Sequence, residues 1–251
     1  MFIHYRTKAI VFGETAQEEA DKLFSLFTKD FGRVEVLGRA IRKTTSKLRA
    51  FIPLFSLCHI EFIQGKGYKI LTDSVLIKDF ENTKEDLARL KVAYKIAEIL
   101  GRSLKGEERD PRLWRLLIET FEVVNSSSLS VADCLLAYYY FFWNFISQMG
   151  YSPELYNCVF CRKKLKPENI YFGKEGVICS LCYSKEKVRL RKKGEKVRKV
   201  DPDTVKIIRE IFKRDIPGIL RIKIKKGHLE RLRRISNNYF FWIIVQSIGQ
   251  K

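Results

Sequence analysis

The stretch Gly32-Arg33-Val34-Glu35-Val36-Leu37-Gly38 decides the fold of the first third of the chain. It alternates polar and apolar residues between two glycines, which is the pattern of a β-strand with one buried face. β-Rich segments at residues 2–12, 51–63 and 68–77 surround it. Residues 20–27 fit either a helix or a strand, because periodicity alone does not separate the two. Four or five short strands within about 80 residues favour a small barrel or sandwich.

The region from about residue 82 to residue 150 has the apolar spacing of helices. Amphipathic patterns cover residues 87–100 and 113–124, and a third helix contains ten consecutive apolar residues at 134–143. Ten residues are too few to span a bilayer, so this pattern predicts a helix buried on most sides. Its six aromatic residues, 138–143, fit either a base-stacking platform or a hydrophobic core, and the helical context favours the core.

Two pairs of residues predict where these helices begin. Thr83 with Asp86, and Ser130 with Asp133, each have the spacing of a capping box. Two further helices are expected at residues 203–213 and 228–248. The sequence therefore predicts a multi-domain α+β fold, with a β-rich domain at 1–80 and a helical domain at 81–251.

The strongest local motif is a set of four cysteines. Cys158-Val159-Phe160-Cys161 is followed, after 17 residues, by Cys179-Ser180-Leu181-Cys182. Two CxxC turns with this spacing let four sulfurs converge on one ion, as in structural zinc sites. Residues 162–178 between the pairs suit a hairpin, and the site is expected as an insertion at 155–185. Unrelated buried thiols, disulfides or an iron–sulfur cluster are the alternatives.

The charge of the chain is large and unevenly distributed. The 251 residues carry a formal net charge of +19, of which residues 154–251 contribute +16, residues 1–80 contribute +4 and residues 81–153 contribute −1. A strongly basic balance favours a polyanionic partner such as nucleic acid. Six cysteines are too sparse for a disulfide scaffold, and no apolar run reaches the length of a membrane span. We therefore expect a soluble protein of a reducing compartment.

Two basic segments are candidates for binding phosphates. Residues 39–49 contain five cations and no acid, and residues 185–199 contain nine cations and two acids. Each fits either a solvated segment or a surface that follows a nucleic-acid backbone. The residues predicted to bind DNA are Arg33, Arg39, Arg42, Lys43, Lys47 and Arg49.

No catalytic constellation is visible in the sequence. His4, His59 and His228 are far apart and lack metal-ligand spacing, and the motifs GxxxxGK[ST], GxSxG and HExxH do not occur. The sequence therefore predicts a binding protein rather than an enzyme.

An ordered set of short segments resembles the RecO family of bacterial recombination mediator proteins. It begins with Ala9-Ile10-Val11-Phe12 and Leu26-Phe27-Thr28-Lys29-Asp30-Phe31-Gly32-Arg33-Val34. It continues with Gly38-Arg39-Ala40, Ser46-Lys47-Leu48-Arg49, Pro53-Leu54-Phe55-Ser56, Leu71-Thr72 and Met149-Gly150-Tyr151-Ser152-Pro153-Glu154-Leu155. The chain departs from the family pattern at Lys43-Thr44-Thr45, which replace a stretch that usually bears proline.

The resemblance implies an N-terminal OB-fold, a helical domain and an embedded zinc site. It implies that the protein binds single- and double-stranded DNA, anneals complementary strands, and loads RecA onto DNA coated by the single-stranded-DNA-binding protein SSB. The partners that it implies are RecR and the acidic C-terminal tail of SSB, in the cytoplasm and associated with the nucleoid. Two other classes remain open from the residues alone: an RNA-binding or ribosome-associated zinc-ribbon module, and a nuclease or other metal enzyme.

Overall fold

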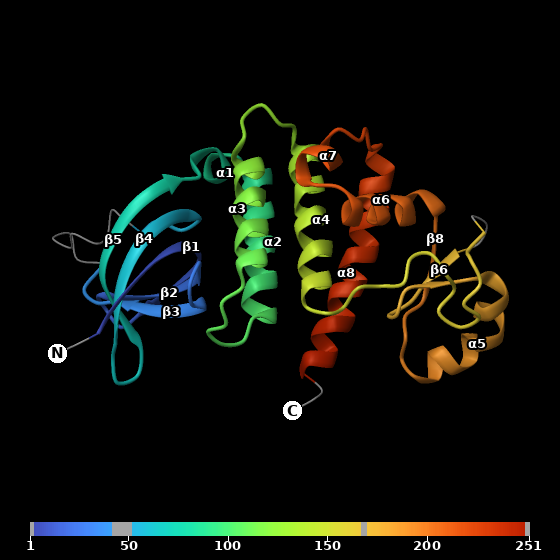
Figure 1. Ribbon diagram of the computed structural model, residues 1–251, viewed down its shortest axis with the longest axis horizontal. Helices are drawn as coiled ribbons and strands as arrows, with labels where there is room; N and C mark the ends of the chain where they lie inside the picture. The colour runs from blue at the N-terminus through green and yellow to red at the C-terminus, as the bar shows by residue number, and fades with distance from the viewer. Residues whose placement is uncertain (1–2, 42–51, 167–169, 249–251) are drawn as a thin grey trace. The chain divides into compact units, whose positions relative to one another are not determined.

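A computed structural model describes residues 3–41, 52–166 and 170–248 of the chain (Figure 1). The chain divides into two compact units, Met1–Cys134 and Leu135–Lys251, so that the boundary falls inside a helix. The strands of the first unit are β1 (His4–Gln17), β2 (Asp21–Thr28), β3 (Gly32–Gly38), β4 (Ser56–Gln64) and β5 (Lys69–Asp79). Its helices are α1 (Glu81–Glu85), α2 (Leu87–Ser103) and α3 (Pro111–Asn125), and α4 (Val131–Gln148) begins in it.

The five strands close into a barrel in the order β1-β2-β3-β5-β4. β1 pairs with β4 through its first half and with β2 through its second half, and the register shifts between Val11 and Gly13. A parallel pairing of β3 with β5, in which Val36 lies opposite Lys69, completes the closure. Five strands in this order form an OB-fold barrel, as the family resemblance implied; the strand pattern alone had left a barrel or a sandwich open.

The alternation of polar and apolar residues at 32–38 directs one face of β3 into the barrel interior. Val34 and Val36 of β3 are buried, whereas the residues that alternate with them, Arg33, Glu35 and Leu37, are partly exposed. Residues 20–27, which fitted either a helix or a strand, lie largely within strand β2. Gly32, at the turn before β3, has a φ of +64°, and a Cβ there would lie 2.0 Å from the carbonyl oxygen of Glu108. Glycine therefore provides both the left-handed turn and the space for this approach.

One of the two predicted capping boxes is confirmed. At the start of α4, Ser130 donates its backbone N–H to the Asp133 carboxylate, and Asp133 donates its own to the Ser130 hydroxyl. The box predicted at Thr83 and Asp86 is wrong. Thr83 lies inside α1, and Asp86 is itself the N-cap of α2, accepting the N–H groups of Ala88 and Arg89. The short helix α1 ends at Glu85, one residue before Asp86. The spacing of the capping box does not predict this break between two helices.

The second unit contains the rest of α4, a small sheet and four further helices. Its strands are β6 (Ile170–Phe172), β7 (Val177–Ile178) and β8 (Arg198–Val200), in the order β7-β6-β8. Its further helices are α5 (Ser180–Lys192), α6 (Pro202–Lys213), α7 (Ile216–Leu220) and α8 (Lys226–Ile248). In the described part of the chain, no helix is both long enough and apolar enough to cross a bilayer.

The aromatic run of α4 forms the core of this second unit. Tyr138 to Trp143 are all buried, which confirms the core interpretation over the base-stacking one. The ring of Trp143 lies 5.1 Å from that of Tyr239 on α8, 6.3 Å from that of Phe172 on β6 and 6.4 Å from that of Phe212 on α6. One indole therefore joins the small sheet to two helices.

Candidate metal centre and nucleic-acid interface

The hairpin expected between the two CxxC motifs is present. β6 and β7 pair antiparallel, with Tyr171 opposite Ile178, and β7 leads directly into Cys179. Cys179 is the N-cap residue of α5, so the second motif begins where the strand gives way to the helix. The first motif bends tightly, because the N–H of Arg162 donates to the carbonyl of Cys158 and Arg162 has a φ of 60°. We refer to residues 154–200, which contain both turns, as the cysteine knuckle.

The four sulfur atoms converge on one point. The Sγ atoms of Cys158, Cys161, Cys179 and Cys182 all lie within 4.8 Å of one another, and those of Cys161 and Cys179 are 4.0 Å apart. Tetrahedral coordination with bonds of about 2.3 Å requires sulfur separations of about 3.8 Å. All six cysteines are free thiols, which excludes the disulfide alternative in this structure. The cluster therefore fits a single metal ion held by four sulfurs.

The hydrogen bonds around the sulfurs also suit thiolates. The N–H of Cys179 donates to Cys158 Sγ over 3.4 Å, and the N–H of Cys182 donates to Cys179 Sγ over 3.5 Å. Burial opposes ionisation of Cys158, but N–H groups of Cys161, Cys179 and Phe160 outweigh it and lower the pKa of its thiol to about 7. Desolvation and the other three sulfurs raise the pKa of Cys182 to about 12. Four sulfurs this close resist shared ionisation until a cation compensates their charge.

A small hydrophobic cluster supports the metal centre. Cys158, Ile178 and Leu190 are buried together, and the rings of Tyr171 and Tyr183 stack with their centroids 3.8 Å apart. This cluster ties α5 to the β6–β7 hairpin and so fixes the two CxxC turns relative to each other. Cys58 and Cys134 are buried elsewhere, and burial raises the pKa of both thiols, as expected for inert core cysteines.

Only two of the six residues predicted to bind DNA fall within the described part of the chain. Arg39 follows β3 and is exposed. Arg33 is partly buried, and its guanidinium donates to the carbonyls of Gly101 and Leu104 over 2.8 Å and pairs with Glu35. Arg42, Lys43, Lys47 and Arg49 lie outside the described residues.

The contacts of Arg33 indicate a structural role that the sequence did not reveal. Gly101 and Leu104 stand at the C-terminal end of α2, where unpaired carbonyls carry negative charge. Arg33 therefore fastens this helix end to β3 of the barrel.

The variant Arg33→Ala is expected to lower the free energy of unfolding by about 1–3 kcal/mol, because it removes charge-assisted hydrogen bonds to two carbonyls. Urea unfolding measures this loss. The exposed neighbour Arg39→Ala is the control and is expected to unfold as the unmodified protein does. Equal stability of the two variants would show that the Arg33 contacts contribute nothing.

A buried arginine is the second feature that the sequence analysis missed. The guanidinium of Arg89 on α2 donates to the carbonyls of Val124, Ser126 and Leu129, each over 2.6 Å, and the residue is 7% exposed. The sequence carried a signal for it, because Arg89 lies on the same helical face as the apolar Val92. A cation within an apolar stripe indicates a buried, paired charge.

The basic run at residues 185–199 is divided between two elements. Most of it lies on α5, and Arg198 and Lys199 lie on β8, an edge strand of the three-stranded sheet. Its lysines and arginines are exposed in both places. The fold thus places this charge on the ordered surface of the cysteine knuckle rather than on a solvated tail.

Comparisons with known proteins agree with this architecture. The family model "Recombination protein O N terminal" matches residues 1–80, and the model "Recombination protein O C terminal" matches residues 84–244. A protein of Dehalococcoides mccartyi strain ATCC BAA-2100, named DNA repair protein RecO, is 32% identical over 230 residues, which are 91% of this chain and 86% of the relative. A protein of the same name from Listeria innocua is 23% identical over 235 residues, which are 94% of this chain and 88% of the relative. The two family models cover the barrel and nearly all of the helices, and the chain therefore belongs to the RecO family of DNA repair proteins.

Proposed function

We propose that this protein is a recombination mediator that binds single- and double-stranded DNA and anneals complementary strands. The observation that carries the proposal is the concentration of positive charge, +16 in residues 154–251, in a chain of the RecO family. Two DNA strands repel each other through their phosphates, and a protein that neutralises both can hold them close enough to pair. The proposal assigns the protein no catalytic step.

In the cell, the proposed activity is loading of RecA onto DNA coated by SSB, together with RecR. The family membership supports this role, and the positive charge suits the acidic tail of SSB. We place the protein in the cytoplasm, associated with the nucleoid.

The metal that we propose for the cysteine knuckle is zinc. Four thiol ligands in CxxC pairs are typical of structural zinc sites, and four protein ligands leave no position open for a substrate. The ion would therefore hold the two turns together rather than perform chemistry.

The barrel is the proposed site of first contact with DNA, through Arg39, Arg42, Lys43, Lys47 and Arg49. OB-fold barrels bind single strands with basic grooves and loops, which supports this assignment. Arg33 remains in the proposed set. We expect it to contribute less to DNA affinity than Arg39 does, because its guanidinium already contacts two carbonyls and Glu35.

The triple variant Arg39→Ala, Lys43→Ala and Lys47→Ala tests this surface. Its affinity for an oligonucleotide is expected to fall, and the slope of log K against log salt is expected to fall by about one for each phosphate that the variant no longer neutralises. Fluorescence anisotropy at several salt concentrations measures both.

The matched control replaces three exposed cations on the helical side of the same unit, Lys91, Arg109 and Arg115, with alanine. The two variants change the charge equally, so a difference between them reports position. Unchanged affinity and slope in the first variant would overturn the assignment of residues 39–49 to DNA binding. Tighter binding of RNA than of DNA, without annealing, would instead favour the RNA-binding alternative.

A further inference from the structure

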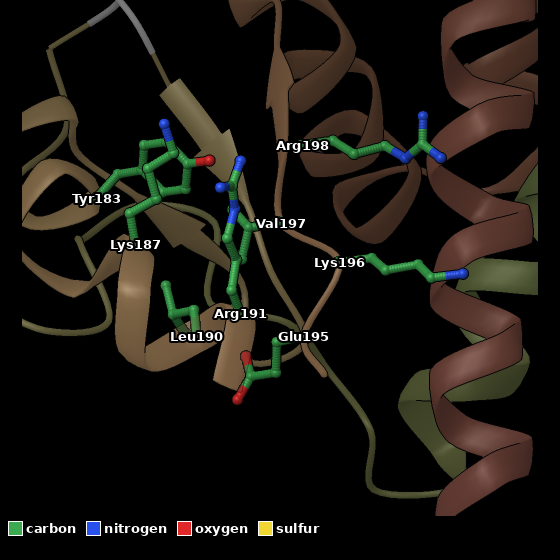
Figure 2. A pocket seen from close by; sticks show the side chains of 8 residues that line it. All are labelled: Tyr183, Lys187, Leu190, Arg191, Glu195, Lys196, Val197 and Arg198. Carbon is green, nitrogen blue, oxygen red and sulfur yellow. The ribbon is translucent and has the colours of Figure 1, made fainter. Parts of the chain in front are cut away.

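Two open cavities of the second unit are lined by positive charge and share one residue. The first, of about 410 Å³, lies between α5 and the segment that leads into β8 (Figure 2). The second, of about 700 Å³, lies between β8, the start of α6 and α8. Arg198 lines both cavities, and we treat the linings of the two cavities together as one surface. Both volumes lie in the range of about 300–1,000 Å³ that is usual for ligand sites.

Cations from three separate elements line this surface, which we name the basic track. Lys187 and Arg191 come from α5, Lys196 and Arg198 from β8 and the segment before it, and Arg231 and Arg234 from α8. Figure 2 shows Arg191 directed toward Tyr183, whereas Lys196 and Arg198 extend toward α8. The fold therefore brings together charges that are more than 40 positions apart in the sequence.

The negative charge along the track is small, and one of its two carboxylates is engaged by other groups of the protein. Glu195 and Asp201 are the carboxylates that line the two cavities. Asp201 caps α6 by accepting from the N–H and hydroxyl of Thr204, and it lies 3.6 Å from the guanidinium of Arg231. Within the described residues, the side chains of Arg191, Arg198 and Arg234 have no ion pair or hydrogen bond with the protein.

These three arginines contrast with their neighbours on α6. Arg209 on α6 donates to the carbonyl of Leu155, and Arg214, the residue directly after α6, pairs with Glu210. An arginine held by an internal partner stabilises the fold, whereas one directed into an open cavity remains available to an external anion. The track therefore contains three guanidinium groups that line its cavities without an acidic partner in the described part of the chain.

We propose that the basic track binds the phosphates of a second DNA strand, while the barrel holds the first. This inference rests on the proposed function and names a second DNA-binding surface for it. Cations distributed over three elements and two cavities suit a chain of phosphates better than a single anion.

The test uses the full chain and the triple variant Arg191→Gln, Arg198→Gln and Arg234→Gln. The slope of log K against log salt for a single-stranded oligonucleotide is expected to fall by about two, since each contact contributes about 0.7. The rate at which two complementary labelled oligonucleotides anneal is expected to fall by on the order of tenfold at low salt. Fluorescence anisotropy and energy transfer between the labels measure the two effects.

The matched control is the variant Arg221→Gln, Lys223→Gln and Lys225→Gln, which removes three exposed cations of the same unit outside the track. It is expected to change slope and annealing less than the track variant does. Metal content and melting temperature of both variants show whether they fold. If the melting temperature of the track variant is lower than that of the unmodified protein, the single variant Arg198→Gln replaces it in the test. Its salt slope is expected to fall by about 0.7.

The failure of this inference is distinguishable from the failure of the proposed function. An unmodified protein that neither binds nor anneals DNA overturns both. A protein that anneals, with a track variant equal to the control variant, overturns the track alone. Tighter binding of a polyglutamate peptide than of the oligonucleotide, lost in the track variant, would assign the track to an acidic protein segment and overturn the inference.

Discussion

Cys158→Ser is expected to remove the bound metal and to unfold the cysteine knuckle. Cys158 is the buried member of the four sulfurs, and its Sγ accepts the N–H of Cys179 from the other turn. Without it, three sulfurs remain on two turns that are otherwise connected by a small hydrophobic cluster and a few backbone hydrogen bonds, such as that from the N–H of Val159 to the carbonyl of Val177. The small cluster of Ile178 and Leu190 beside them is too limited to replace a structural ion. Zinc binding contributes about 10–16 kcal/mol to the folding of isolated zinc-finger peptides, which indicates how large the contribution of a structural ion to stability can be.

Metal analysis of the purified protein and calorimetry measure this result. We expect one equivalent of zinc in the unmodified protein and none in the variant, with a loss of several kcal/mol in the stability of the second unit. Chelation of the unmodified protein should reproduce the loss. The melting temperature of the second unit should fall clearly. The affinity for a single strand should fall only in part, because the barrel that is proposed to bind it belongs to the first unit.

The control is Cys134→Ala, which removes a buried thiol far along the sequence from the CxxC pairs. It should lower stability modestly and leave the metal content unchanged. Freshly purified protein that contains neither zinc nor iron would contradict the site altogether. An iron content with the absorbance of a cluster would assign the four cysteines to iron and sulfide instead.

Arg89→Met is expected to destabilise the first unit by about 3 kcal/mol, roughly 1 kcal/mol for each of the three carbonyls that loses a charge-assisted hydrogen bond. Three carbonyls at the end of α3 and in the segment after it would lose the guanidinium that donates to them. Methionine preserves most of the volume, so the loss reports hydrogen bonds rather than a cavity. Urea unfolding measures the difference.

Two further variants sharpen this result. Arg89→Lys retains the charge but cannot reach three acceptors at once, so it should recover only part of the stability. Arg115→Met removes an exposed cation from α3 and should change the stability by less than about 0.5 kcal/mol. If Arg89→Met unfolds like Arg115→Met, the network does not stabilise the fold.

Local patterns in the sequence predicted the elements that depend on neighbouring residues. The alternation around Val34 and Val36 predicted the strand β3 with the limits that it has, and the spacing of Ser130 and Asp133 predicted the start of α4. The cysteine spacing predicted that four sulfurs would meet, because each CxxC turn is itself a local structure. The order of the barrel strands followed from the family resemblance rather than from periodicity.

Features that depend on distant residues could not be predicted in the same way. Arg33 was predicted to bind DNA, but the carbonyl groups that its guanidinium contacts lie about 70 positions later in the sequence. The same limit hid the basic track, since β8 and α8 contribute charges that are neighbours only after folding. The capping box at Thr83 and Asp86 placed the start of α2 too early. Thr83 belongs to the separate short helix α1, and α2 begins only after its N-cap residue, Asp86.

Annealing of two complementary labelled oligonucleotides at two salt concentrations tests the central claim most directly. The protein is expected to accelerate pairing at low salt, with DNA precoated by SSB as well as with bare strands, and to lose most of this effect when the salt is raised. A protein that neither retards the oligonucleotides on a gel nor speeds their pairing at low salt would contradict the account.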